Sequence, residues 1–265
     1  MKTLLILLLS ISLSNIALAG NSVFIEQIGT STDTTVNIDI GGNNNSVNLS
    51  MEGTGNELDF KQEGNNNTIS WVSYWGSGKA WGGDLDGNNN TLKFEQYNTT
   101  GSDSNKIGFH MLGNSNELHV CQGATFSSST DTTCSGTTPN SEYGGHTVNL
   151  DVHANGNSIK VGQETGTGNA DHYAQIYYYG GDNNDTFLTQ KGNANKTLNM
   201  IIRTDGGEQE LMQKGDGAHT ATIDLTGSYH TDMSMTQQGN TAQSYSLTQN
   251  CQTSGGCSVS VTQGN

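Results

Sequence analysis

The sequence predicts an all-β fold, a two-sheet parallel β-solenoid of about nine two-strand coils. Three observations predict it: short segments in which apolar and polar residues alternate, a regular spacing between these segments, and a Gln that closes every second one. The composition agrees, because 35 Gly and 1 Pro in 265 residues suit many short strands joined by turns.

A seven-residue template carries the alternation. Residues 56–62 read Asn-Glu-Leu-Asp-Phe-Lys-Gln, and residues 90–96 and 157–163 follow the same plan. In an extended strand the first, third, fifth and seventh residues share one face. Each template therefore predicts a half-buried strand, with Asn, two apolar side chains and Gln inside and charged or small polar side chains outside.

The order of the segments predicts the topology. Even-numbered segments from the fourth to the eighteenth end in Gln, whereas odd-numbered ones from the third to the fifteenth end in another residue. Like segments stack on like if each coil holds two strands, which gives two parallel sheets face to face. An antiparallel sandwich or barrel would explain the alternation but not this two-strand recurrence. The seventh positions of the 18 segments are Gln27, Ile40, Met51, Gln62, Ser73, Gln96, Met111, Gln122, Val152, Gln163, Tyr178, Gln190, Ile201, Gln213, Leu225, Gln237, Gln249 and Gln263.

One segment fits the template imperfectly. It begins at Asn195, but Leu198, Met200 and Ile202 favour a register shifted by one residue.

The amide side chains of the template are expected to form ladders along the coil axis. Stacked amides satisfy one another's donors and acceptors from rung to rung, so they tolerate burial while the register is kept. His146, His172 and His219 occupy the position usually held by Asn, and we interpret them as substituted rungs rather than catalytic bases. The residues assigned to the ladders are Asn21, Gln27, Asn56, Gln62, Asn90, Gln96, Asn116, Gln122, Asn157, Gln163, Asn184, Gln190, Gln213, Gln237, Gln249 and Gln263.

Residues 1–19 are predicted to be a signal peptide. Lys2 precedes an apolar stretch, and Ala17 and Ala19 form a small-residue cleavage site before Gly20. The stretch falls short of the ~20 residues that span a bilayer, and no later segment is apolar enough to do so. We therefore expect a secreted chain whose solenoid covers residues 20–265, with insertions near residues 74–90 and 123–145.

The four cysteines suit an oxidising compartment. They fall into two local couples, and of the three connectivities we predict the disulfides Cys121–Cys134 and Cys251–Cys257. No Cys-x-x-Cys or nearby His-x3-His motif points to a metal site.

Four aromatic residues surround the start of the first insertion: Trp71, Tyr74, Trp75 and Trp81. Exposed aromatic rings beside Gly suit a loop that stacks on surface glycans or contacts another subunit. The alternative is local packing of these rings against the solenoid.

The charge balance limits the function. A net charge of −15, from 25 Asp+Glu against 10 Lys+Arg, excludes a basic nucleic-acid binder. No Gly-x-Ser-x-Gly motif is present. Residues 84–90 have the acidity of a calcium loop, but their Gly is fourth rather than sixth, so we expect a turn. We predict no enzymatic activity, no cofactor and no metal site.

Three turn regions carry a resemblance to a known repeat. Residues 62–67 read Gln-Glu-Gly-Asn-Asn-Asn, residues 190–195 Gln-Lys-Gly-Asn-Ala-Asn, and residues 237–242 Gln-Gln-Gly-Asn-Thr-Ala. They resemble the curlin repeat, which reads approximately Ser-x5-Gln-x-Gly-x-x-Asn-x5-Gln. The resemblance implies a secreted subunit of a curli-like functional amyloid fibre that supports surface adhesion and a biofilm matrix. In that family a minor subunit nucleates the fibre and a major one polymerises.

The terminal segments predict how copies would associate. Monomeric solenoids cover their end strands, because an exposed strand edge is a template for pairing. Here we expect no such cover, since the first strand opens at Asn21 and the last closes at Gln263. Copies are therefore expected to self-associate end to end into fibres, with a nucleating subunit as a partner. The alternative is a monomeric acidic β-solenoid adhesin that binds glycans through its aromatic loop.

Overall fold

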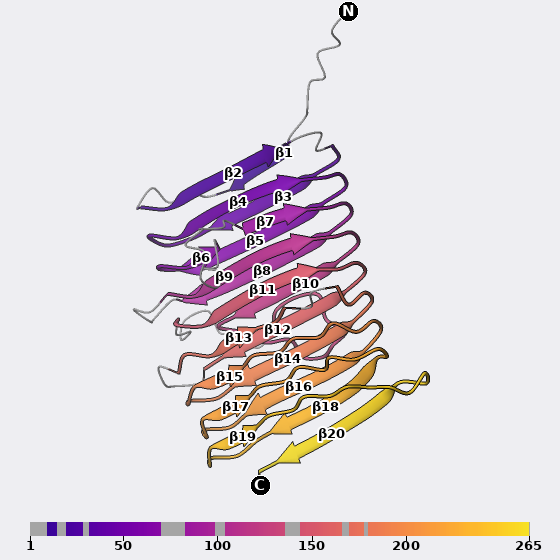
Figure 1. The fold of residues 1–265 in the computed structure, drawn as a ribbon. Coiled ribbons are helices and arrows are strands. Elements are labelled where there is room, and N and C mark those ends of the chain that lie inside the picture. Colours follow the sequence, from indigo (N-terminus) through magenta and orange to yellow (C-terminus); the bar gives the residue numbers. More distant parts are fainter. Residues whose placement is uncertain are drawn as a thin grey trace, which may run out of the picture.

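The computed structural model describes residues 10–14, 20–28, 32–69, 83–98, 104–135, 144–165, 170–177 and 180–264. Over these residues the chain winds as a flattened coil between two facing sheets and climbs steadily from the N-terminal to the C-terminal end (Figure 1). The described residues contain no helix, and thus none long and apolar enough to cross a membrane.

The two sheets take alternate strands of the chain, and all neighbouring strands are parallel. Nine coils, from β2–β3 to β19–β20, confirm the predicted two-strand solenoid. Sheet A contains, in spatial order, β1 (Ser10–Ser14), β3 (Thr35–Ile40), β5 (Glu57–Gly64), β8 (Thr91–Asn98), β10 (Glu117–Gln122), β12 (Ser158–Glu164), β14 (Asp185–Lys191), β16 (Glu208–Lys214), β18 (Thr231–Gln237) and β20 (Cys257–Gln263). Sheet B contains β2 (Ser22–Ile28), β4 (Ser46–Glu52), β6 (Thr68–Ile69) with β7 (Gly83–Asp86), β9 (Lys106–Leu112), β11 (Thr147–His153), β13 (Tyr173–Gln175), β15 (Lys196–Leu198), β17 (His219–Ala221) and β19 (Gln243–Tyr245).

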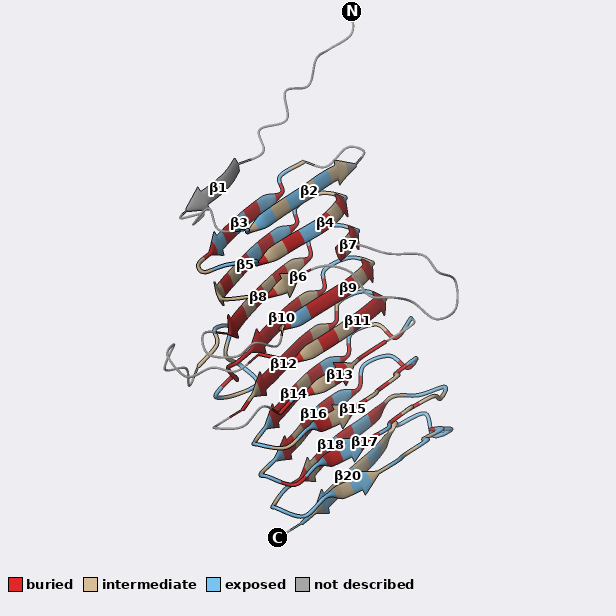
Figure 2. Cartoon of the chain, turned by 90° about the vertical axis from the view of Figure 1, so that its left-hand side faces the viewer, coloured by how far each residue is buried: buried red, intermediate tan, exposed pale blue. Residues whose placement is uncertain are grey.

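The register places like residues above one another, so each core position becomes a column along the axis. In sheet A, Phe60 pairs with Phe94, and their rings stack with centroids 5.1 Å apart. Apolar columns from both sheets meet in one continuous core. Figure 2 shows that the middle strands are largely buried, whereas β20 is not, because a terminal coil has a neighbour on one side only.

The first insertion interrupts a strand rather than a turn. β6 and β7 share one rung of sheet B, and Leu85 of β7 lies between Met51 and Met111 in a core column with no exposure. The prediction of an insertion near residues 74–90 is therefore wrong for residues 83–86, which are strand. Leu85 also takes the column assigned to Ser73, which lies outside the described residues.

The imperfect segment adopts the shifted register. Lys196 pairs with His219, and Leu198 pairs with Ala174, so Lys196 stands in the column of the ladder residues. Met200 and Ile202 are buried, whereas Ile201 is only half-buried. The seventh position is thus Ile202 and not Ile201, because the shift keeps three apolar side chains inside.

The Gly-rich turns stack as closely as the strands. Gly87 has a φ of +151°, and a Cβ added there would lie 1.7 Å from the carbonyl oxygen of Gly113 in the next coil. Only Gly permits both this conformation and this approach.

Both predicted disulfides are present, each with a Cα–Cα distance of 5.8 Å. Cys121–Cys134 ties the middle of the second insertion to β10, where Cys121 packs with Tyr97, Ala124 and Phe126 in a small cluster outside the main core. Cys251–Cys257 joins the segment after β19 to the first residue of β20.

Candidate functional site: amide ladders and sheet edges

A glutamine ladder runs through sheet A. In each step the side-chain Nε2 donates to the Oε1 of the next coil over 2.8–3.0 Å. The second Nε2 hydrogen reaches a backbone carbonyl of sheet B, as from Gln163 to Thr147 O at 3.2 Å. Each amide therefore bonds its coil to the next and also ties the two sheets together. The members are Gln62, Gln96, Gln122, Gln163, Gln190, Gln213, Gln237 and Gln263.

An asparagine ladder stands at the other end of the same strands. The Oδ1 of each residue accepts the backbone N–H of the next rung over 2.8–3.0 Å, and the last accepts from Gly207 at 2.9 Å. These rungs are the predicted residues Asn56, Asn90, Asn116, Asn157 and Asn184.

The matching ladder of sheet B begins with amides and continues with imidazoles. Asn21 Oδ1 accepts the backbone N–H of Asn45, and Asn105 Oδ1 accepts that of His146. From there Nδ1 of His146 accepts the N–H of His172 at 3.2 Å, so this nitrogen replaces an amide oxygen. The interpretation of the histidines as substituted rungs agrees with this geometry for His146 and His172. His219 stands in the same column beside Lys196, but its Nδ1 accepts no hydrogen bond among the described residues. Asn45 and Asn105 are rungs that the sequence pattern did not assign.

The imidazoles must be neutral to fill this place, because a protonated Nδ1 cannot accept a hydrogen bond. The rings of His146 and His172 stack with centroids 4.9 Å apart. Burial lowers the pKa of His146 well below its usual value, and the neighbouring imidazole of His172 contributes a smaller lowering. Burial lowers the pKa of His172 to about 4.

A lysine follows the histidines in the same ladder. The backbone N–H of Lys196 donates to His172 Nδ1 at 3.3 Å, and its Nζ donates to three carbonyls at 2.7–2.8 Å, those of Ala194, Gly215 and Gly217. Burial lowers the pKa of Lys196 to about 8. The sequence analysis missed this rung, although the shifted register was the signal for it.

The ladders end differently at the two ends of the molecule. Gln62 Oε1 is buried and accepts no hydrogen bond among the described residues, because Ile40 occupies the place above it. Gln263 is half-buried in the last coil. The assignment of Gln27 and Gln249 to a ladder is wrong within one molecule, because they are the only Gln residues at the seventh positions of sheet B, and Gln27 pairs with Met51.

Three terminal strands have one neighbour each within the described part of the chain. β2 pairs only with β4, β19 only with β17 and β20 only with β18. The fourth edge, that of β3, was expected to be uncovered, but β1 pairs with it from Ser10↔Thr35 to Ser14↔Asp39. β1 lies within the predicted signal peptide, so the edge of β3 is covered in the full chain.

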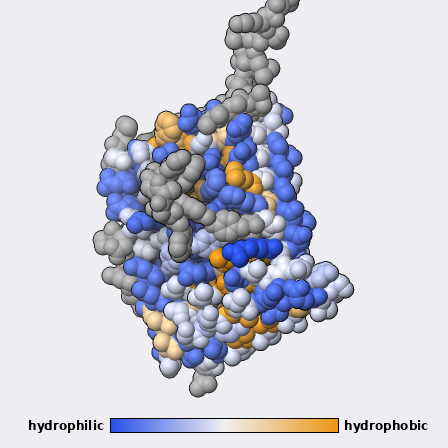
Figure 3. Space-filling view, viewed as in Figure 1, coloured by the Kyte–Doolittle hydropathy of each residue, from blue (hydrophilic) through white to orange (hydrophobic). Residues whose placement is uncertain are grey.

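The face of the molecule seen in Figure 3 is mostly hydrophilic, with smaller hydrophobic areas between the polar side chains. Glu57, Asp59 and Lys93 lie on the outer side of sheet A, where Asp59 pairs with Lys93. Burial raises the pKa of Asp59. Lys93 opposes this shift, and the neighbouring acidic residues add to it. The aromatic loop residues Trp71, Tyr74, Trp75 and Trp81 lie outside the described residues.

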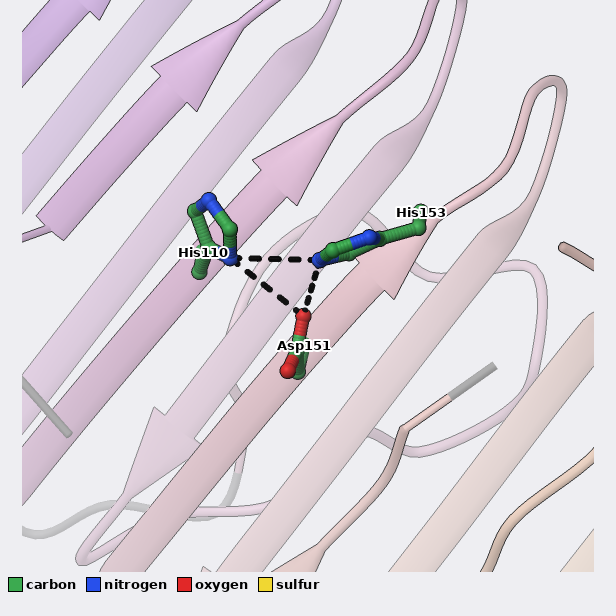
Figure 4. A group of neighbouring side chains, drawn as sticks. All are labelled: His110, Asp151 and His153. Carbon is green, nitrogen blue, oxygen red and sulfur yellow. Dashed lines mark hydrogen bonds and ion pairs between the residues drawn. The ribbon is translucent and has the colours of Figure 1, made fainter. Parts of the chain in front are cut away.

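A histidine–aspartate cluster on the outer face of sheet B is the one group of potential metal ligands found among the described residues (Figure 4). It consists of His110 on β9 and of Asp151 and His153 on β11. The sequence analysis missed it, although His110 and Asp151 precede the seventh residues of consecutive sheet B segments.

The chain has no match among protein-family models, curated proteins or solved structures.

Proposed function

We propose that the chain is the secreted structural subunit of a curli-like extracellular amyloid fibre, in which copies join end to end to support surface adhesion and a biofilm matrix. A nucleating subunit would start the fibre. The observation that carries the proposal is that the exposed edges at the two ends repeat the pattern by which neighbouring coils pair inside the molecule.

The free backbone N–H and C=O groups at the two ends of the molecule are spaced so that they can pair with each other. In a parallel ladder, alternate residues bond to opposite neighbours. Cys257 donates to His230 O, and Gln263 accepts from Gln238, so Ser258, Ser260 and Thr262 direct their N–H and C=O groups to the free edge. At the other end Ser22 donates to Asn45 O. The backbone N–H and C=O groups of Val23, Ile25 and Gln27 therefore point to the free edge of β2.

Inside the molecule the same division holds. The side chain of Ser158 points to the outer face, and its N–H donates to Asn184 O of the following coil. A strand thus always bonds forward through residues with outer side chains and backward through residues with core side chains. Placing β19 and β20 of one copy on β2 and β3 of another continues this division without a change of register.

The core columns also match across such a junction. Tyr245 and Leu247 would meet Val23 and Ile25, all of which pack against the main core. In sheet A, Val259 and Val261 would meet the columns of Val36 and Ile38 of the second copy. Gln249 would stack on Gln27, which gives a functional reason for Gln in these two terminal segments of sheet B.

Removal of residues 1–19 would be the step that frees the junction. β1 occupies the edge of β3 in the full chain, and cleavage before Gly20 would uncover it. Assembly before export would then be blocked at this edge.

The test compares two substitutions at Ser260 in the chain that begins at Gly20. Ser260→Pro removes an N–H that faces the free edge, and it spares the bonds between β20 and β18. We expect Ser260→Ala to form thioflavin-positive fibres visible by electron microscopy and Ser260→Pro to remain monomeric with the same circular dichroism spectrum.

Equal fibre formation by both variants would refute end-to-end growth through β20. A parent chain that stays monomeric would refute the fibre and favour the glycan-binding adhesin. That function predicts glycan-array binding that is lost in Trp75→Ala and Trp81→Ala.

A further inference from the structure

Three potential metal ligands converge on the outer face of sheet B (Figure 4). Asp151 Oδ1 lies 2.6 Å from His153 Nε2 and 3.5 Å from His110 Nδ1, and the two ring nitrogens are 3.2 Å apart. We propose that His110, Asp151 and His153 bind a divalent transition-metal ion, with Zn²⁺ as the reference ion. The proposal is independent of fibre formation.

The distances are close to those of a metal-bound set. Zn–N and Zn–O bonds of about 2.0–2.1 Å in a tetrahedron separate neighbouring ligand atoms by about 3.3 Å. Two of the three observed separations already lie near this value. The third would open by less than ~1 Å when an ion enters, which a change of side-chain torsion can supply.

The carboxylate oxygen at the centre is available for an ion. Asp151 Oδ1 is buried, and the two imidazole nitrogens of the cluster lie 2.6 and 3.5 Å from it. Two imidazoles and one carboxylate form a donor set that zinc sites use and that also binds other divalent transition metals such as iron.

A second carboxylate lies behind the first imidazole. Asp84 Oδ2 is 3.6 Å from His110 Nε2, the ring nitrogen that points away from Asp151. In metal sites a carboxylate that accepts a hydrogen bond from the outer ring nitrogen holds the ring and its tautomer, so that the other nitrogen is the ligand; here the 3.6 Å contact would shorten slightly to do so. Asp84 is thus a positioning residue, and Nδ1 of His110 is directed toward the site.

The strands supply a rigid support. Asp84, His110 and Asp151 are direct cross-strand partners on β7, β9 and β11, and His153 stands two residues further along β11. The intervening Val152 is buried in the core, which fixes the strand. The side chains of His110, Asp151 and His153 are 24%, 11% and 35% exposed, so an ion can enter and water can complete its coordination.

This site adds a ligand to a chain for which the sequence predicted none. Alternation within the template places only His110 and Asp151 on the outer face, since His153 follows the seventh residue Val152. Their convergence depends on the register between β9 and β11. The position of Asp84 beside His110 depends on β7 pairing with β9 in sheet B.

The test is a Zn²⁺ titration by calorimetry on tag-free, monomeric Ser260→Pro protein, so that the result does not depend on assembly. We expect one ion per chain. Asp151→Asn and His153→Ala are expected to weaken binding more than 10-fold, and Asp84→Asn about 10-fold. His230→Ala, at a histidine outside the cluster, is the matched control and is expected to bind like the parent.

A folding defect is separated by circular dichroism, because all four positions lie outside the core and their variants are expected to keep the strand spectrum. The Co²⁺ form supplies a second readout, since its visible absorption reports imidazole coordination. Equal Zn²⁺ affinity in the parent and in His153→Ala, or an equal loss in His230→Ala, would overturn the proposal.

Discussion

Gln163 and Gln190 are joined through their side chains inside the core, where Gln163 Nε2 donates to Gln190 Oε1 over 2.8 Å. Neither residue is exposed to solvent. Gln163 also accepts from Gln122 and donates to Thr147 O, so all its polar groups are satisfied. A buried amide column of this kind contributes to stability only while each member finds its neighbours, because an unpaired buried polar group costs free energy.

Gln163→Leu is therefore expected to be strongly destabilising. It leaves Gln122 without its acceptor, and Gln190 and Thr147 without a donor. At roughly 1–3 kcal/mol for an orphaned group, partly offset by the added apolar side chain, the loss is about 2–5 kcal/mol. Urea unfolding of a monomeric Ser260→Pro background measures it. Gln263→Leu is the control, because only its bond from Gln237 at 2.9 Å joins it to the ladder, and it should cost less than about 1 kcal/mol. Equal shifts at both positions would contradict a cooperative ladder.

The imidazole rungs predict loss of stability in acid. The folded chain lowers the pKa of His172 from 6.5 to about 4, so between these values the unfolded state binds more protons. Stability is then fully present above about pH 6.5 and falls as the pH decreases toward 4, by about 3 kcal/mol for this residue. Tm measured across this range checks the direction.

His172→Asn separates this effect from the titration of carboxylates. Asn supplies the acceptor in the first rungs of the same ladder, so the variant is expected to fold and to lose part of the decline between pH 6.5 and 4. The same decline in parent and variant would assign the pH dependence to other groups.

The sequence predicts the repeating part of this structure well, because one template governs each rung. Alternation places Phe60 and Phe94 inside, and the recurrence of Gln specifies two strands per coil. The prediction fails where two separate strands, β6 and β7, form one rung. Leu85 of β7 completes a rung whose first part, β6, ends at Ile69. Nor does the sequence pair His110 with Asp151, because contacts on the outer face depend on register and on which segment occupies the adjacent rung.

The covered edge of β3 makes a prediction for hydrogen exchange. Thr35 donates to Asn56 O, just before β5, and Gly41 donates to Gln62 O of β5, so the amides of Val36, Ile38 and Ile40 face β1 or, after its removal, solvent. In a monomeric Ser260→Pro chain that starts at Gly20, we expect these three amides to exchange rapidly. They should be protected in the chain that retains residues 1–19 and in fibres of the parent. Rapid exchange in the fibres would show that β3 is not part of the junction.

Salt is expected to accelerate assembly. The full chain has a net charge of −15, and without Lys2 the chain from Gly20 has −16, so approaching copies repel each other. Raising the ionic strength from about 0.01 to 0.15 M shortens the screening length from ~30 to ~8 Å. The junction itself adds little repulsion, because the outer residues of β20 are Ser258, Ser260 and Thr262. The thioflavin lag time of the chain from Gly20 should therefore shorten with NaCl, and MgCl₂ at equal ionic strength should act alike if screening alone is responsible. A lag time that is unchanged or longer at high salt would show that charge repulsion does not limit end-to-end contact.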